Sequence, residues 1–150
     1  MSGAWLKYLC VSVCLLLVGC VTASDQPYFE APVIAQPELK LLDETLITVK
    51  VYDPYDIVKK VEGVVLEDTT GLRFPFRDDG LKGDEVAGDQ VWSIKVKVPY
   101  DGWAGTFTFE VKAYTAKDDL VIVRDAFNEV APMTTTLRLD VQLPKPEVTP

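Results

Sequence analysis

The densest group of side chains able to do chemistry lies between residues 78 and 89. It consists of the carboxylates Asp78, Asp79, Asp84, Glu85 and Asp89, interleaved with glycines. Ca²⁺ prefers carboxylate and carbonyl oxygens, so one interpretation is a calcium site at Asp78, Asp79, Asp84 and Asp89. Their spacing is not that of an EF-hand loop. The alternative is structural, because aspartates accept hydrogen bonds from nearby amides in Asx-turns while glycines adopt positive φ angles.

The rest of the composition argues against most catalytic chemistry. The chain of 150 residues contains no histidine, which excludes catalysis that needs an imidazole base. It carries 15 basic and 23 acidic side chains, and a net charge of −8 opposes binding to a nucleic-acid backbone. Paired carboxylates that hydrolyse glycosides need a concave site. We therefore expect no enzyme, no nucleic-acid partner and no cofactor, apart from the Ca²⁺ considered above.

Two aromatic residues are candidates for ligand contact. Tyr100 and Trp103 flank Asp-Gly, a turn signal between two apolar runs. Aromatic rings at the tip of a turn can stack on sugar rings or another small ligand. The alternative is that Trp103 folds over the end of the domain and closes its core. The sequence leaves both interpretations open.

A period of two residues dominates the middle of the chain. Apolar side chains alternate with polar ones in five runs, at residues 47–51, 72–76, 92–98, 107–113 and 137–143. Such alternation is typical of strands with one face on a core and the other in water. Residues 58–66 and 120–123 predict two further strands, and Pro75 predicts an edge or bulge position. The sequence thus predicts an all-β fold, an antiparallel β-sandwich of about seven strands over residues 39–143.

The acidic segment also resembles a known family. Residues 78–93 read DDG, then GD, then AGD, then Trp92-Ser93, and are followed by Val96-Lys-Val-Pro99 and by residues 105–111. This order resembles immunoglobulin-like or fibronectin-III-like modules of bacterial surface proteins, including those named "choice-of-anchor". Gln90 stands where that family usually has glycine. The resemblance covers about residues 46–113 and implies an immunoglobulin-like sandwich, with Trp92 in its core.

The first twenty residues have the features of an export signal. Lys7 precedes an apolar run of residues 8–18, which is shorter than the ~20 residues of a membrane-spanning helix. The run ends in Leu17-Val18-Gly19-Cys20, which resembles the lipobox of bacterial lipoproteins. The resemblance implies a cleaved signal peptide, residues 1–19, and a lipid on Cys20. An ordinary secretory signal and an uncleaved anchor are the alternatives.

These features predict an organisation and a role. We expect a lipid-anchored tether at residues 20–38, which contains three prolines, and a proline-rich tail at residues 144–150. The expected function is a non-catalytic protein-interaction or scaffolding module of the cell envelope. The alternative is a module that binds glycans or small ligands, with Ca²⁺ as a stabilising ion. The expected partners are the membrane, through acyl chains such as palmitate on Cys20, and an envelope protein. By resemblance to the sorting rules of Gram-negative lipoproteins, Val21 in place of an aspartate after Cys20 implies delivery to the outer membrane.

Overall fold

The computed structural model describes residues 25–99 and 104–143, and in these ranges it contains strands and no helix. Within this part, therefore, no helix is able to cross a membrane. The strands are β1 (Tyr28–Phe29), β2 (Val33–Ile34), β3 (Glu38–Lys40), β4 (Glu44–Tyr52), β5 (Lys60–Val65), β6 (Arg73–Pro75), β7 (Val91–Lys97), β8 (Gly105–Tyr114), β9 (Ile122–Arg124), β10 (Val130–Pro132) and β11 (Thr134–Gln142).

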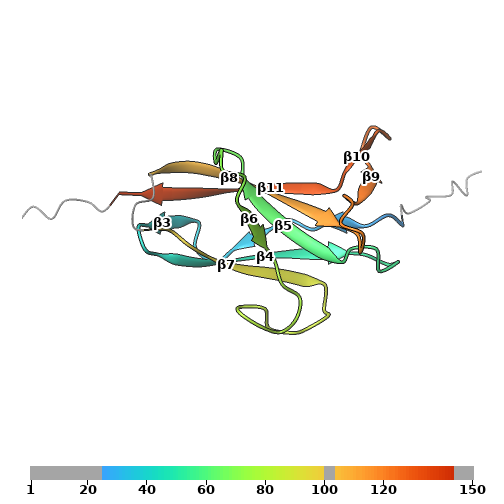
Figure 1. Ribbon diagram of the computed structural model, residues 1–150, viewed down its shortest axis with the longest axis horizontal. Helices are drawn as coiled ribbons and strands as arrows, with labels where there is room; N and C mark the ends of the chain where they lie inside the picture. The colour runs from blue at the N-terminus through green and yellow to red at the C-terminus, as the bar shows by residue number, and fades with distance from the viewer. Residues whose placement is uncertain (1–24, 100–103, 144–150) are drawn as a thin grey trace, which may run out of the picture.

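The strands form two layers that face each other (Figure 1). In the first, β4 lies in the middle, with β7 on one edge and the short β1 and β2 along the other. The second has the order β3-β11-β8-β5-β6. All neighbours are antiparallel except β3 and β11, which are parallel. After β6 the chain passes from the second sheet to the first. The Phe76 amide still bonds to Val61 on β5, whereas the next residue, Arg77, pairs with Ser93 on β7.

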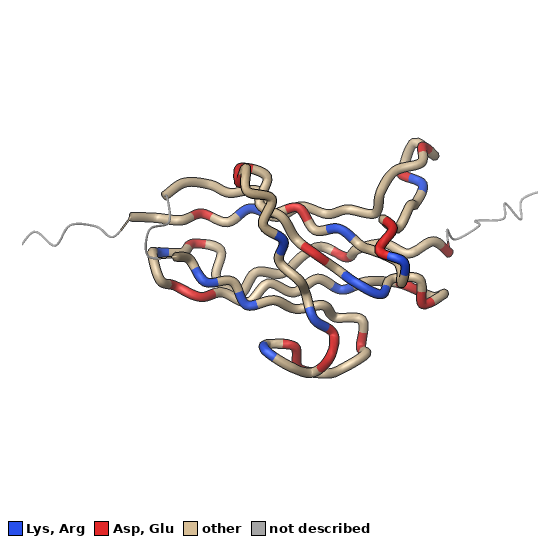
Figure 2. Tube along the Cα trace, in the orientation of Figure 1, with Lys and Arg blue, Asp and Glu red and all other residues tan. Residues whose placement is uncertain are grey.

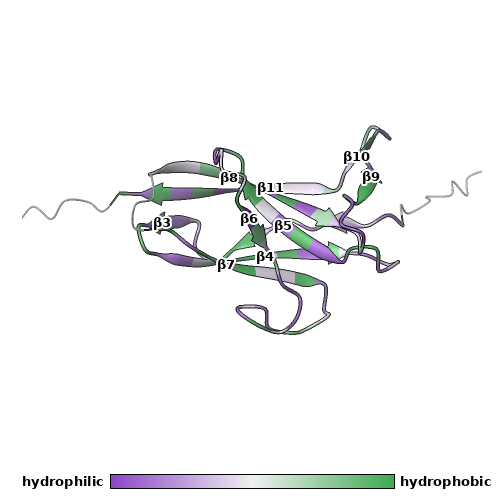
Figure 3. Ribbon diagram, viewed as in Figure 1, coloured by the Kyte–Doolittle hydropathy of each residue, from purple (hydrophilic) through white to green (hydrophobic). Residues whose placement is uncertain are grey.

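The core lies between the two layers and follows the predicted alternation. Figure 3 shows apolar and polar residues alternating along the long strands. The buried apolar residues on these strands are Ile47, Val49 and Val51 on β4, Phe109, Val111 and Ala113 on β8, and Leu137, Leu139 and Val141 on β11. Burial of apolar area stabilises such a core by roughly 25 cal/mol for each Å² removed from water. A hydrophobic core can therefore hold this domain together.

This arrangement is an immunoglobulin-like β-sandwich, so the predicted fold class is confirmed. The number of strands is higher than the predicted seven because the chain also forms short strands of only two or three residues. Trp92 lies on the inner face but is only partly buried against the core. Ser93, on the opposite face of β7, is also buried, and its backbone pairs with Arg77.

The structure corrects the expected tether. Residues 28–29 pair with the end of β4, residues 33–34 with its middle, and residues 38–40 with β11. The prediction of a tether is therefore wrong from Tyr28 onwards, where the chain belongs to the sandwich. The prolines of this segment separate the short strands, because proline has no amide hydrogen for a continuous ladder. Cys20 and the tail 144–150 lie outside the described residues.

Candidate functional site

The acidic loop, residues 78–90, connects Arg77 to β7. Arg77 and Ser93 exchange two backbone hydrogen bonds of 2.8 Å, which fix both ends of the loop. Figure 2 shows acidic residues along it, below the sheets in that view. Gly83 lies close to the side chains of Leu46 and Lys95, on the outer face of β4 and β7. The loop thus covers part of the first sheet.

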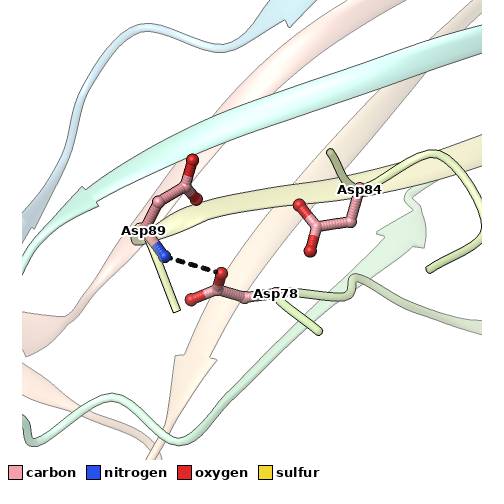
Figure 4. Close-up of side chains that lie close together, drawn as sticks. All are labelled: Asp78, Asp84 and Asp89. Carbon is pink, nitrogen blue, oxygen red and sulfur yellow. Dashed lines mark hydrogen bonds between the residues drawn. The ribbon is translucent and has the colours of Figure 1, made fainter. Parts of the chain in front are cut away.

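The structure brings together three of the four predicted calcium ligands. One carboxylate oxygen from each of Asp78, Asp84 and Asp89 lies within 4.8 Å of the others, and the three side chains converge in Figure 4. Asp79 does not join them. Its carboxylate accepts a 2.9 Å hydrogen bond from Nε of Arg77, which lowers the pKa of Asp79. The prediction is therefore wrong for Asp79, because a neighbouring guanidinium holds it outside the cluster.

Backbone amides occupy most of the oxygens of the cluster. Asp78 accepts hydrogen bonds from the amides of Gly88 (2.8 Å), Asp89 (3.2 Å) and Gln90 (3.3 Å). The amide of Gly80 donates to Asp84, and the amide of Val91 donates to Asp89 at 2.9 Å. These are the turn-stabilising bonds that the structural interpretation predicts.

The backbone of the loop needs the left-handed conformation at several steps. Gly80 and Gly88 have φ angles of 72° and 74°, and Gln90 has 66°. Gln90 therefore adopts the conformation that glycine would adopt there, although it has a side chain. The hydrogen bond that its backbone amide donates to the Asp78 carboxylate helps to hold this conformation.

Burial and a neighbouring charge raise the pKa of Asp78, whereas its hydrogen bonds lower it. Desolvation raises the pKa of the Asp78 carboxyl, and the neighbouring charge of Asp84 raises it further. The amides of Gly88, Gln90 and Asp89 offset part of this rise. The cluster therefore consists of repelling carboxylates that the loop amides hold together. Both carboxylate oxygens of Asp78 and one each of Asp84 and Asp89 already accept hydrogen bonds from loop amides, which leaves few oxygens free for a Ca²⁺ shell of six to eight.

We predict that millimolar Ca²⁺ does not change the melting temperature of the full chain. The reason is that a cation at this place has to compete with amides for the same carboxylate oxygens. Thermal melts with and without the ion test this, with Mg²⁺ as the control. A rise in melting temperature that Ca²⁺ produces and that Asp84→Asn removes would contradict the structural interpretation.

An apolar recess of about 640 Å³ lies between the two sheets. Its walls are apolar side chains, and the residues of one lip belong to the loop between β5 and β6. The walls include Leu39, Val65, Phe74, Val96, Val98, Phe107, Leu139 and Val141, and the lips include Glu67, Asp68, Thr69, Thr70, Lys97 and Pro99. Because Thr69, Thr70 and Pro99 are exposed, the recess opens to solvent. The sequence predicts its inward-facing walls but not that the sheets leave space between them.

Strands β9 and β10 with the turn between them, residues 122–132, form a hairpin that stands off the sandwich (Figure 1). We refer to these residues as the hairpin. Phe127 at its turn is 85% exposed, and Ile122 and Val130 on its strands are also exposed. The sequence analysis missed this feature. The signal that was available is a phenylalanine inside an Asp-x-x-Asn turn, where polar residues are usual.

The remaining candidates, Tyr100, Trp103 and Cys20, lie outside the described residues. Pro99, which lines the recess, directly precedes Tyr100 in the sequence. Their predicted roles in ligand contact and lipid attachment stay predictions.

Comparison with known proteins adds no family. No protein-family model matches the chain, and no curated protein matches it. Among solved structures, it is similar to an endo-β-1,4-mannanase from Thermotoga petrophila, with a TM-score of 0.46, 10% identity and 92% of this chain covered. The chain spans about a quarter (24%) of that mannanase. It is also similar to a Niemann-Pick type C2 protein from the Japanese carpenter ant, with a TM-score of 0.40, 17% identity, and coverage of 82% of this chain and 96% of that one. At these scores neither likeness extends to function.

Proposed function

We propose that this chain is a lipid-anchored, non-catalytic interaction module of a bacterial cell envelope, and that the apolar recess receives its protein partner. The recess is the observation that carries the proposal. Binding energy at protein interfaces concentrates where an apolar anchor side chain fills a desolvated pocket. A volume of about 640 Å³ with apolar walls is suited to such an anchor.

The lip of the recess indicates the chemistry of the partner. Glu67 accepts a 2.8 Å hydrogen bond from the Thr108 amide, which lowers the pKa of Glu67. Hydrogen bonds from Thr70, led by its hydroxyl, lower the pKa of Asp68. Both carboxylates therefore stay ionised at neutral pH and outnumber the ammonium group of Lys97, which also lines the recess. We expect the partner to present an apolar side chain beside Lys or Arg.

The position of the recess relative to the N-terminal segment supports a tethered role. Tyr28 pairs with Tyr52 at one end of β4, whereas the recess residue Val96 pairs with Thr45 near the other end. Seven residues of strand separate these positions, which is about 23 Å. An anchor at Cys20 therefore connects to one end of the sandwich, and the recess lies near the opposite end. Attachment to a membrane also raises the effective concentration around envelope partners.

The absence of catalysis is part of this proposal. The sequence contains no histidine. The carboxylates that the structure brings together accept hydrogen bonds from loop amides on the outer face of the first sheet. They do not line the recess. Glu67 and Asp68 do line it, but hydrogen bonds from Thr108 and Thr70 lower the pKa of both carboxyls, which does not suit a general acid at neutral pH.

Site-specific photocrosslinking tests the recess. A photoreactive amino acid replaces Leu72, which is 57% exposed on the β5–β6 loop beside the lip. The matched control replaces Lys50, which is exposed on the outer face of β4. We expect Leu72 to crosslink one envelope protein in cells and Lys50 not to crosslink it. Equal crosslinking from both positions, or none from Leu72, would contradict the proposal.

A small apolar ligand is the second candidate occupant, because the volume of the recess also lies within the range of small-molecule sites. Quenching of tryptophan fluorescence separates the two candidates. If soluble oligosaccharides or another small ligand quench tryptophan fluorescence, and the quenching is lost in Val96→Phe but not in Ile94→Phe, the ligand-binding alternative replaces the protein partner. Ile94 is the control because it lies on the same face of β7 but does not line the recess.

Cys20→Ala is expected to abolish incorporation of labelled palmitate. The reason is that Cys20 is the single thiol left after cleavage before it, since Cys10 and Cys14 lie within residues 1–19. Metabolic labelling of cells that make the wild-type or the variant chain measures this, with Cys14→Ala as the control. Persistent labelling of Cys20→Ala would remove the anchor from the proposed function.

A further inference from the structure

The hairpin presents an apolar tip on a rigid frame. Asp125 accepts hydrogen bonds from the amides of Phe127 (2.8 Å) and Glu129 (2.9 Å), and Asn128 closes the turn with a φ angle of 63°. At its base, Val121 and Met133 are buried and joined by a 2.7 Å backbone hydrogen bond. The backbone that carries the exposed Phe127 is therefore held by hydrogen bonds, so little backbone entropy is lost when the tip contacts another surface.

A side chain near the N-terminal end of the described chain holds the hairpin. The amide of Gln26 donates to the carbonyl of Arg124, and the backbone amide of Arg124 donates to Gln26 at 2.8 Å. The hydroxyl of Tyr55, which is 62% exposed, donates to Asp25 at 3.4 Å. The exposed Tyr55 and the hairpin thus both contact residues 25 and 26, at the N-terminal end of the described chain.

The length of the chain before Gln26 limits how far this end can lie from an anchor. Six residues separate Cys20 from Gln26 and span at most about 20 Å when fully extended. Phe127 follows Arg124 by three residues, which adds about 10 Å of reach from Gln26. A lipid on Cys20 therefore keeps the tip of the hairpin within reach of the surface in which that lipid is inserted.

The charges of the hairpin favour a lipid surface with no net charge. Residues 122–132 contain one cation, Arg124, and two anions, Asp125 and Glu129, of which Asp125 is already bonded to the turn. The whole chain is acidic and is repelled by anionic headgroups. Tyrosine, as at position 55, is enriched at membrane interfaces, and phenylalanine, as at position 127, buries an apolar ring in them. Contact with lipid therefore depends on apolar burial, which is weak without an anchor nearby.

We propose that the hairpin docks on the bilayer that holds the anchor, with Phe127 at the level of the headgroups and the recess directed away from it. This inference rests on the lipid anchor of the proposed function. The docking gives a folded part of the chain a second, reversible contact with the membrane. Two contacts together define the orientation of the sandwich on the membrane. The occupant of the site is the lipid surface, not a protein.

Depth-dependent quenching tests the docking. The full chain, made in bacteria with its N-terminal segment, is reconstituted into phosphatidylcholine vesicles after Phe127→Cys is labelled with an environment-sensitive dye. The matched control carries the dye at Leu72→Cys, on the β5–β6 loop next to the lip of the recess. We expect the emission of the dye at residue 127 to shift to the blue and to be lost when doxyl-labelled phosphatidylcholine is included. The dye at residue 72 is expected not to change.

The outcomes separate failure of docking from failure of the anchor. If the chain floats with the vesicles while the dye at residue 127 behaves like that at residue 72, the docking is overturned and the anchor stands. If the chain does not float, both are overturned. If only an added envelope protein, and not lipid, shields residue 127, the hairpin is a protein interface and the docking is again overturned. Melting temperatures of both labelled chains verify that they are folded.

Discussion

Replacing Gly63 with alanine is expected to lower the melting temperature of the protein by about 10 °C, because the change costs about 2–3 kcal/mol of folding free energy. Gly63 lies on the inner face of β5 and is buried. A Cβ atom there would lie 1.9 Å from Cε1 of Phe109 and 2.5 Å from its Cζ. Phe109 is fully buried and packs against Phe74 and Phe76, with ring centroids 5.3 Å and 6.2 Å away, and it also lines the recess, so the ring has to leave its packed position and shift toward the recess to accommodate the Cβ.

A double-mutant cycle distinguishes this clash from a general effect of alanine. Phe109→Leu alone destabilises the core through the volume it removes. The pair Gly63→Ala with Phe109→Leu is expected to cost less than the sum of the two single changes, because the smaller side chain leaves room for the new Cβ. Gly71→Ala is the control, since nothing lies within 4 Å and only its φ angle of 70° is strained. Strict additivity of the pair, measured by urea denaturation, would contradict the packing argument.

The sequence predicts the inner faces of the long strands because alternation over seven or more residues is a strong local signal. Ile47 on β4, Phe109 on β8 and Leu139 on β11 are buried as expected. The signal weakens where the chain changes sheets. Leu72 was expected to alternate inward with Phe74 and Phe76, yet it is exposed, because β6 is only three residues long and begins at Arg73.

The features that the sequence did not predict depend on residues distant in the chain. Residues 28–34 form pairs of only two residues with β4, which is too short for any periodicity. The parallel pairing of β3 with β11 joins residues about a hundred positions apart, as does the bond between Gln26 and Arg124. In the acidic loop, the sequence predicts a cluster of four aspartates, of which three lie close together. It did not show that Arg77 draws Asp79 away from Asp78, Asp84 and Asp89.

Asp78→Ala is expected to destabilise the protein by about 1–3 kcal/mol, because it removes the carboxylate that accepts from the amides of Asp89 and Gln90 and leaves the Gly88 amide only the backbone carbonyl of residue 78. These amides are at the end of the loop that leads into β7, so the loss also weakens the first sheet. The matched control is Asp79→Ala, whose exposed side chain is paired only with Arg77 and accepts one loop amide. We expect little change there. Denaturant unfolding measures both variants, and equal losses would show that Asp78 has no special role.

The pH dependence of the two asparagine variants is expected to have opposite signs. Burial raises the folded-state pKa of Asp78 above its ordinary value near 3.8. Stability from this carboxyl is therefore fully present below that value and is lost as the pH rises through the raised pKa. Relative to Asp78→Asn, the wild type should gain stability as the pH falls from 7 toward 4. The Arg77 hydrogen bond lowers the pKa of Asp79, so the wild type should lose stability relative to Asp79→Asn as the pH falls through that lowered pKa. The same sign for both pairs would mean that the burial of Asp78 does not control its ionisation, and the account of the cluster given above would be wrong.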